Sequence, residues 1–141
     1  MANVERLKRA QKMYFDVESR FLACYGNDTV NIISMDPEIN GVVMYHQINK
    51  SMFAKIVDLQ LVSYDFDKLR CDVACQSKEN QNVVVYDISQ TTPDYKRVIT
   101  YLSQKSNDRV KVKIAEDFKK VAMSYGNENY ILTIDDNGHQ N

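Results

Sequence analysis

The sequence predicts an α+β fold: a mostly antiparallel sheet of about eight strands, with two amphipathic helices on one face. Apolar and polar residues alternate with a period of two in most segments, which is typical of half-buried strands. Two stretches, residues 4–18 and 92–105, instead carry apolar residues at helical spacing. Two helices against about eight strands in mostly antiparallel order indicate the α+β class.

The composition indicates one ordinary globular domain, which we expect over residues 1–135, followed by a polar tail, 136–141. Lys and Arg number 18 against 19 Asp and Glu, so the net charge of −1 excludes a strongly basic nucleic-acid protein or an acidic DNA mimic. No run approaches the ~20 apolar residues that span a bilayer, and the polar start is no signal peptide. The three cysteines, an odd number, favour a reducing compartment, so we expect an intracellular protein with no membrane partner.

The first predicted helix follows Asn3, a plausible N-cap, and runs to about residue 18. Its apolar side would contain Val4, Leu7, Tyr14 and Val17. Its first half is crowded with basic residues, which are Arg6, Lys8, Arg9 and Lys12. Two interpretations stay open: a solvated charged face, or a helix that faces phosphate groups.

The clearest strand–turn–strand covers residues 30–35 and 42–48. Pro37 fixes its φ angle in the connecting turn, and Gly41 permits a positive φ where the second strand begins. We expect further strands at residues 19–25, 54–63, 69–75 and 83–88.

The second predicted helix begins at Thr92-Pro93-Asp94, an N-cap followed by proline and an acid in the first turn. Its apolar face would hold Tyr95, Val98, Ile99 and Leu102. After it we expect a strand at 109–114 and a hairpin of 118–125 with 130–134.

No catalytic, metal or cofactor motif is present, and we expect a protein that is not an enzyme. Cys71 and Cys75 lie about 13 Å apart on one face of a strand, too far for one metal ion or a disulfide, so we interpret them as small core residues. Cys24 has no histidine near it in sequence, and His46 alternates with apolar residues as a packed or edge-strand histidine does. A hydrolase or nuclease stays open as a third possibility, with Asp36, Glu38, Asp135 or Asp136 as its carboxylates.

A set of short motifs resembles one domain of a sliding clamp of the proliferating-cell-nuclear-antigen type. They are a basic amphipathic helix, a strand ending in Met35-Asp36-Pro37, the run Gly41-Val42-Val43-Met44-Tyr45, and Asp94 to Leu102 as a second helix before strand 109–114. In that family the helices line a surface that faces the DNA backbone. The chain has room for one such domain, so a closed ring would need several copies.

The resemblance implies a homo-oligomeric accessory protein, a processivity factor for replication or transcription, that binds duplex DNA without reading bases. The residues that would contact phosphates are Arg6, Lys8, Arg9, Lys12, Lys96, Arg97 and Lys105. The alternative is a small assembly or protein-interaction protein of viral or phage type. It would act through sheet edges and exposed aromatic residues, with no nucleic-acid role.

Overall fold

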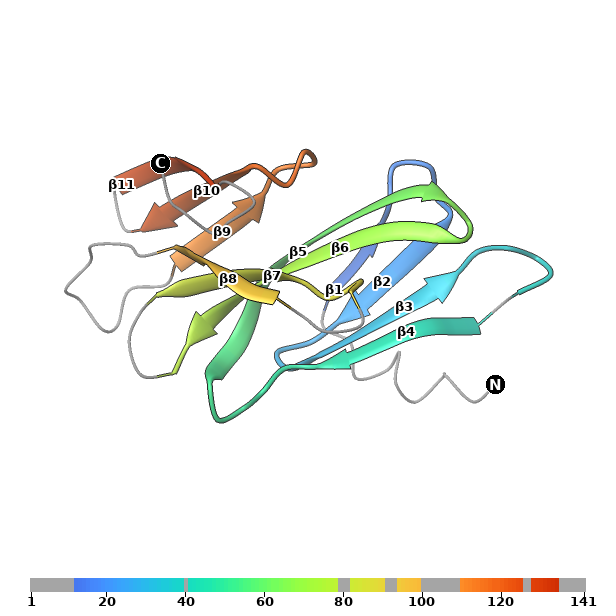
Figure 1. Ribbon diagram of the computed structural model, residues 1–141, viewed down its shortest axis with the longest axis horizontal. Coiled ribbons are helices and arrows are strands. Elements are labelled where there is room, and N and C mark those ends of the chain that lie inside the picture. Colours follow the sequence, from blue (N-terminus) through green and yellow to red (C-terminus); the bar gives the residue numbers. More distant parts are fainter. Residues whose placement is uncertain are drawn as a thin grey trace.

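The computed structural model describes residues 12–39, 41–78, 82–90, 94–99, 110–125 and 128–134, and they form three antiparallel sheets (Figure 1). Sheet A contains β1 (Lys12–Phe15), β2 (Phe21–Tyr25), β3 (Thr29–Ser34) and β4 (Gly41–Gln47). Sheet B contains β5 (Phe53–Asp65), β6 (Lys68–Ser77), β7 (Val83–Asp87) and β8 (Asp94–Ile99). Sheet C contains β9 (Val110–Ile114), β10 (Lys120–Tyr125) and β11 (Glu128–Thr133). Within each sheet, strands that are neighbours in the chain are also neighbours in space.

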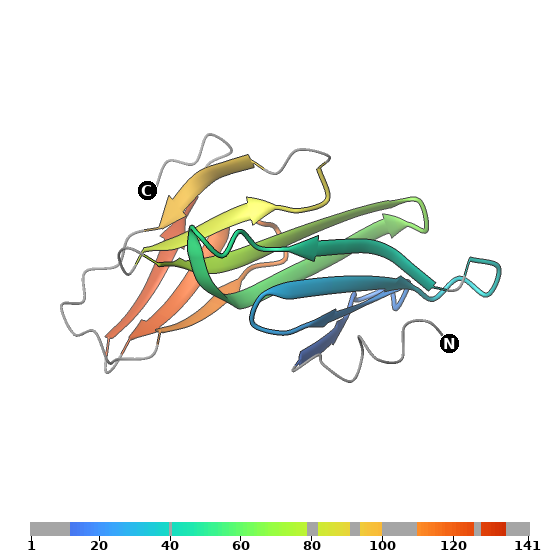
Figure 2. The same ribbon diagram turned by 90° about the horizontal axis from the view of Figure 1, so that it is seen from below.

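Sheet B is the middle layer, with one core on each of its faces. The core between sheets A and B includes Phe21 and Ile32 from sheet A and Leu61 from β5. The core between sheets B and C includes Val85 from β7 and Met123 from β10. In Figure 2 the strands of sheet C cross the direction of the sheet B strands steeply. The middle sheet is therefore covered on both sides.

The middle position of sheet B explains a burial pattern that alternation alone does not predict. In β6 the five consecutive residues from Cys71 to Cys75 are all buried, Asp72 included. Cys71, Val73 and Cys75 face sheet A, while Ala74 faces sheet C. The sequence pattern predicts a half-buried strand here, whereas the structure buries both of its faces.

The α+β prediction is wrong: the described residues contain strands in three antiparallel sheets and no helix. Residues 12–15, the end of the first predicted helix, form β1, whose Tyr14 donates a hydrogen bond to Gln60 in sheet B. Residues 94–99, the start of the second, form β8 and pair with β7. In both stretches cross-strand pairing prevails over helical spacing, which is a weak preference that tertiary contacts override. Residues 16–18 belong to the turn after β1, and the remaining residues of the two predicted helices, 4–11, 92–93 and 100–105, lie outside the described residues.

Two strands also begin later than the alternation predicts, for a reason in the backbone. Strand β2 begins at Phe21 rather than at Ser19, and β10 begins at Lys120 rather than at Phe118. Ser19 and Phe118 have positive φ angles of 56° and 60°, which strands do not accommodate. Each residue therefore belongs to the turn before its strand.

Candidate functional site

The outer face of sheet A, which is turned away from sheet B, carries two rows of side chains that cross all four strands. From β1 to β4 the rows are Met13, Cys24, Asn31 and Tyr45, and then Phe15, Leu22, Ile33 and Val42. Side chains alternate between the faces of a sheet, and the intervening Ala23 and Ile32 belong to the core against sheet B. The two rows therefore lie on the opposite face.

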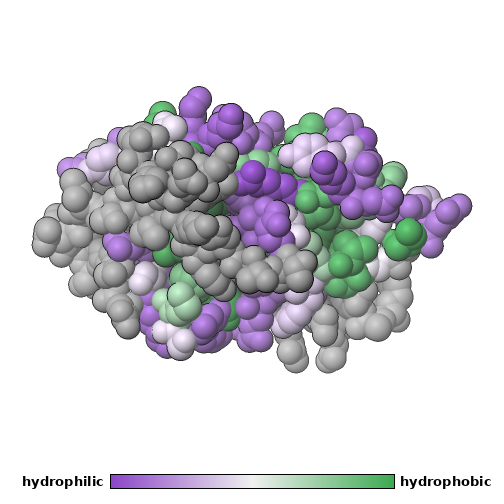
Figure 3. Space-filling model, viewed as in Figure 1, coloured by the Kyte–Doolittle hydropathy of each residue, from purple (hydrophilic) through white to green (hydrophobic). Residues whose placement is uncertain are grey.

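This outer face is apolar and exposed along its two rims. On β1, Met13 and Phe15 are 72% and 55% exposed. On β4, Tyr45 is 48% exposed. Val43, the extra residue of a bulge opposite Ile32 and Ile33, is 46% exposed. No residue of the two rows is charged. Figure 3 shows hydrophobic side chains gathered on the right of the view, over the part of sheet A that contains β3 and β4.

The centre of the outer face is buried. Cys24 is fully buried, and Asn31 and Ile33 are 4% and 7% exposed, although none of the three belongs to either core. The side-chain oxygen of Asn31 has no hydrogen-bond partner among the described residues. An unpaired buried carbonyl oxygen is costly, so Asn31 offers an acceptor to any donor that reaches this face.

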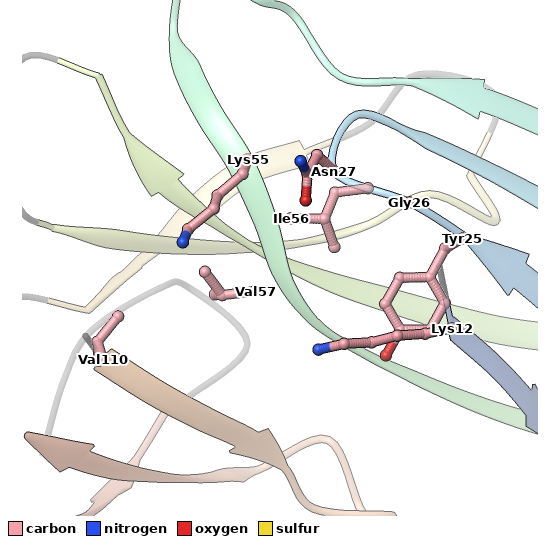
Figure 4. Close-up of a pocket in the computed structure, with 8 residues that line it drawn as sticks. All are labelled: Lys12, Tyr25, Gly26, Asn27, Lys55, Ile56, Val57 and Val110. Atoms are coloured by element: carbon pink, nitrogen blue, oxygen red, sulfur yellow. The ribbon is translucent and has the colours of Figure 1, made fainter. Parts of the chain in front are cut away.

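A hollow of about 170 Å³ opens where sheets A, B and C meet (Figure 4). Lys12 and Tyr25 enter it from sheet A, Lys55, Ile56 and Val57 from β5, and Val110 from β9. Lys12 and Lys55 form no ion pair with a described residue. Burial raises the pKa of the Tyr25 hydroxyl to about 12, so this group is neither acid nor base near neutral pH. The hollow offers positive charge but no pair of groups for proton transfer.

Next to the hollow, side chains of β5 join the edges of three sheets. The carboxylate of Asp58 accepts a hydrogen bond of 2.7 Å from the backbone N–H of Ile114 in β9. The amide of Gln60 donates to the Ile114 carbonyl at 3.0 Å and accepts from the Tyr14 hydroxyl of β1 at 2.8 Å. Strands β1, β5 and β9 are each at the edge of their sheet, and the two bonds to Ile114 occupy backbone groups of β9 that would otherwise be unpaired.

Burial makes Asp58 sensitive to pH in a direction opposite to that of most carboxylates. Its pKa is raised above the ordinary 3.8, mainly because burial disfavours the charge, although the Ile114 N–H and Lys113 favour it. The folded protein therefore binds this proton more tightly than the unfolded chain does. The stability contributed by Asp58 is complete below pH 3.8 and is lost as the pH rises through the raised pKa.

We therefore expect Asp58→Asn to be at least as stable as the wild type at pH 7, since an amide oxygen keeps the bond to Ile114 without the buried charge. The advantage of the variant should shrink as the pH falls toward 3.8. Urea unfolding of both proteins between pH 3.5 and 8 measures this difference. An advantage that grows on acidification would show that the charged form stabilises the fold.

Cys71 and Cys75 are core residues, as the sequence predicts, and His46 packs against the ring of Tyr86. Cys71 and Cys75 are buried, and burial raises the pKa of both thiols, that of Cys75 to about 12. His46 lies on the edge strand β4, 2.9 Å from the Tyr86 hydroxyl, and burial lowers its pKa. No group of three His, Cys, Asp or Glu residues suited to a metal ion occurs in the described part of the chain.

The predicted phosphate-binding residues that the structure describes lie in two different sheets. Lys12 is exposed at the start of β1 and lines the hollow. Lys96 and Arg97 lie in β8, in a different sheet, at the edge opposite β5. Arg6, Lys8, Arg9 and Lys105 lie outside the described residues.

Of the carboxylates of the enzyme hypothesis, Asp36 and Glu38 lie in one exposed turn. Asp36 accepts a bond from the backbone N–H of Glu38 within the same turn, which is local turn geometry. Asp135 and Asp136 lie outside the described residues.

The apolar outer face of sheet A was not predicted from the sequence. Its signal is the alternation of Met13, Phe15 and Val17, since a helix would place Phe15 on the side opposite Met13 and Val17. Interpreted as a strand, the same three residues share one face.

In the part of the chain that the structure describes, no helix has the length and apolar character to cross a membrane. No protein-family model matches the sequence, and the comparison with curated proteins gives no match either.

Proposed function

We propose that this protein is a non-enzymatic interaction protein that binds another folded polypeptide on the outer face of sheet A. The observation that carries the proposal is an uncharged face with apolar side chains exposed on both rims. Each rim groups two exposed apolar side chains, Met13 with Phe15 and Val43 with Tyr45, and grouped exposed apolar side chains mark interaction sites, whereas single ones are normal.

The side chains on the rims suit a protein interface. Phe15 and Tyr45 are large, and aromatic residues are enriched among those that dominate binding energy. Complete burial of a side chain of this size is worth about 1.5–3 kcal/mol. The bulge at Val43 disrupts the regular edge of β4, and such irregularity hinders the addition of a further strand. A partner that packs on the face therefore fits better than one that extends the sheet.

A polypeptide fits this face better than DNA does. Binding to the DNA backbone requires several cations on one surface, and the rows of the outer face contain none. Lys12, the one predicted phosphate-binding residue with a described side chain, alternates with Met13 and lines the hollow on the other side of β1. The helical surface that the clamp resemblance implies would have to include residues that form β1 and β8.

Site-specific photo-crosslinking tests the proposal. A photo-reactive phenylalanine analogue replaces Phe15 in one protein and Ile131, which is 77% exposed on sheet C, in a matched control. We expect protein adducts at position 15 alone, suppressed by excess wild-type protein but not by excess Phe15→Glu. Absence of adducts at position 15, or equal adducts at both positions, would contradict the proposal. Titration with duplex DNA at low and moderate salt should show no salt-dependent binding, whereas steep salt dependence would favour a nucleic-acid role.

A further inference from the structure

Sheet C repeats the first three strands of sheet A at an offset of 99 residues. Phe15 pairs with Leu22, and the residues 99 positions later, Ile114 and Val121, also pair. In the next strand pair, Phe21 pairs with Ser34, and Lys120 pairs with Thr133 at the same offset. Every cross-strand pair of β1 with β2 for which sheet C has a described counterpart follows the same offset.

The turns repeat as well as the strands. The N–H of Ser19 bonds to the carbonyl of Asp16, as that of Phe118 bonds to Ala115, and both donors have φ near 60°. Beyond the third strand, the N–H of Met35 bonds to the carbonyl of Arg20, as Ile134 bonds to Lys119. Equal register, equal turns and equal positive φ angles identify two copies of one three-stranded meander.

The two copies turn opposite faces toward sheet B. The rows of sheet C that pack in the core are Val112, Met123 and Tyr130, and Ile114, Val121 and Leu132. With 99 subtracted, these positions become Met13, Cys24 and Asn31, and Phe15, Leu22 and Ile33, which are the outer rows of sheet A. The outer face of sheet A is thus the counterpart of a face that this same chain buries under a four-stranded sheet.

The remaining face of sheet C, by contrast, is built for solvent. Its exposed residues are Lys111, Lys113, Lys120, Ala122, Asn129, Ile131 and Thr133. One copy of the meander therefore has an apolar face covered and a polar face exposed, while the other has both faces apolar. An apolar second face is expected where a further sheet packs on it.

We propose that a second copy of this chain packs against the two exposed rims of the outer face of sheet A, so that two A sheets face each other in a two-fold dimer; this rests on the proposed function. The face is uncharged, so a copy of itself meets no like-charge repulsion. Isologous two-fold contacts are the commonest way in which identical chains associate. The chain also shows, in sheet C on sheet B, that a β-sheet covers this type of face.

Side-chain exposure and the direction of the two-fold axis also determine which residues of the two copies meet. Because Cys24, Asn31 and Ile33 are already buried, the rims on β1 and β4 provide the side chains for the second copy. A two-fold axis parallel to the strands places the β1 rim of each copy opposite the β4 rim of the other. Such an axis keeps each position along the strands, so Met13 of one copy lies opposite Tyr45 of its partner and Phe15 lies opposite Val42, each twice per dimer.

Light scattering on the full chain over a range of concentrations tests the dimer. We expect the mass of two chains for the wild type, and a dissociation constant at least about 30-fold weaker for Phe15→Lys, for Met13→Lys and for Tyr45→Glu, since each places a charge among the uncharged side chains of the two rims. Ile131→Lys, an equally drastic change on sheet C, should leave the mass of two chains. Unchanged cooperative unfolding of each variant controls for loss of the fold.

Mixing a β1 variant with a β4 variant tests the axis. One copy with Met13→Lys and one with Tyr45→Glu form a lysine–glutamate contact on one side of the dimer and keep the native pair on the other. We expect the mixture to regain the mass of two chains. A mixture that stays monomeric would overturn the pairing of β1 with β4.

Other results would overturn the dimer itself. A wild type that is monomeric at every concentration, or dissociation by Ile131→Lys as strong as that by Phe15→Lys, would do so. Crosslinks from position 15 to a different protein would keep the interaction proposal and reject the second copy. Crosslinks from position 15 to residues 1–11 of the same chain, located by mass spectrometry, would reject both and assign the face to the N-terminal segment.

Discussion

Leu61→Ala is expected to lower the free energy of unfolding by about 3–5 kcal/mol, a large share of the total stability of a domain of this size. Leu61 is fully buried in the middle of β5, in the core between sheets A and B. Its neighbours are held in two sheets, so they cannot close the cavity without shifting a strand. Urea unfolding at constant pH measures the change through the midpoint of the transition.

Ile131→Ala is the matched control for this loss of apolar volume. Ile131 is 77% exposed on the solvent face of sheet C, so its truncation should change the unfolding free energy by less than about 0.5 kcal/mol. A cost below about 1 kcal/mol for Leu61→Ala would contradict the arrangement of sheet B as a packed middle layer.

Gln60→Ala is expected to cost about 2–4 kcal/mol, although Gln60 is a polar residue. Its side chain is 2% exposed and bonds to Tyr14 of β1, to the carbonyl of Ile114 in β9, and to the N–H of Leu61 at 3.0 Å. Truncation leaves these buried groups without their partner, and each buried group left unsatisfied costs about 1–3 kcal/mol. Hydrogen exchange should show the greatest loss of protection at Ile114 and its neighbours in sheet C.

Two further variants separate the contributions at Gln60. Tyr14→Phe removes one of the bonds and should cost about 1 kcal/mol. Gln47→Ala, at the exposed end of β4, removes the same side chain without a buried bond and should be nearly neutral. If Gln60→Ala were as mild as Gln47→Ala, the network would not hold sheet C in place.

The strands were largely predictable from sequence, because period-two alternation and turn residues are local signals. The strands around Pro37 and Gly41, the long apolar β5 and the terminal hairpin all lie near their expected positions. Helices were predicted where apolar residues also fit a period of 3.6. At Tyr14 and Val17, and again at Val98 and Ile99, the two periods both place apolar residues acceptably over so short a stretch.

The layers and the candidate site could not be predicted in the same way. The outer face depends on pairs such as Cys24 with Asn31 and Asn31 with Tyr45, and these form only once the register of the sheet is set. The duplication is hidden because matched residues share little beyond apolar character, as Phe15 and Ile114 do. In sheet C the alternation of Lys111 and Lys113 with Val112 and Ile114 indicates the buried face, but in sheet A both faces are apolar, so which of them meets sheet B is a tertiary choice.

The connectivity of the three sheets has a consequence for how the protein folds. Every described strand pairing joins neighbours along the chain, so each sheet can form by successive hairpin closure over short loops. Pairings of this kind give a low contact order, which favours fast folding despite the all-β architecture. The slow step should then be the docking of preformed sheets onto β5. The polar bonds that Asp58 and Gln60 of β5 form with Ile114 of sheet C are made in that step.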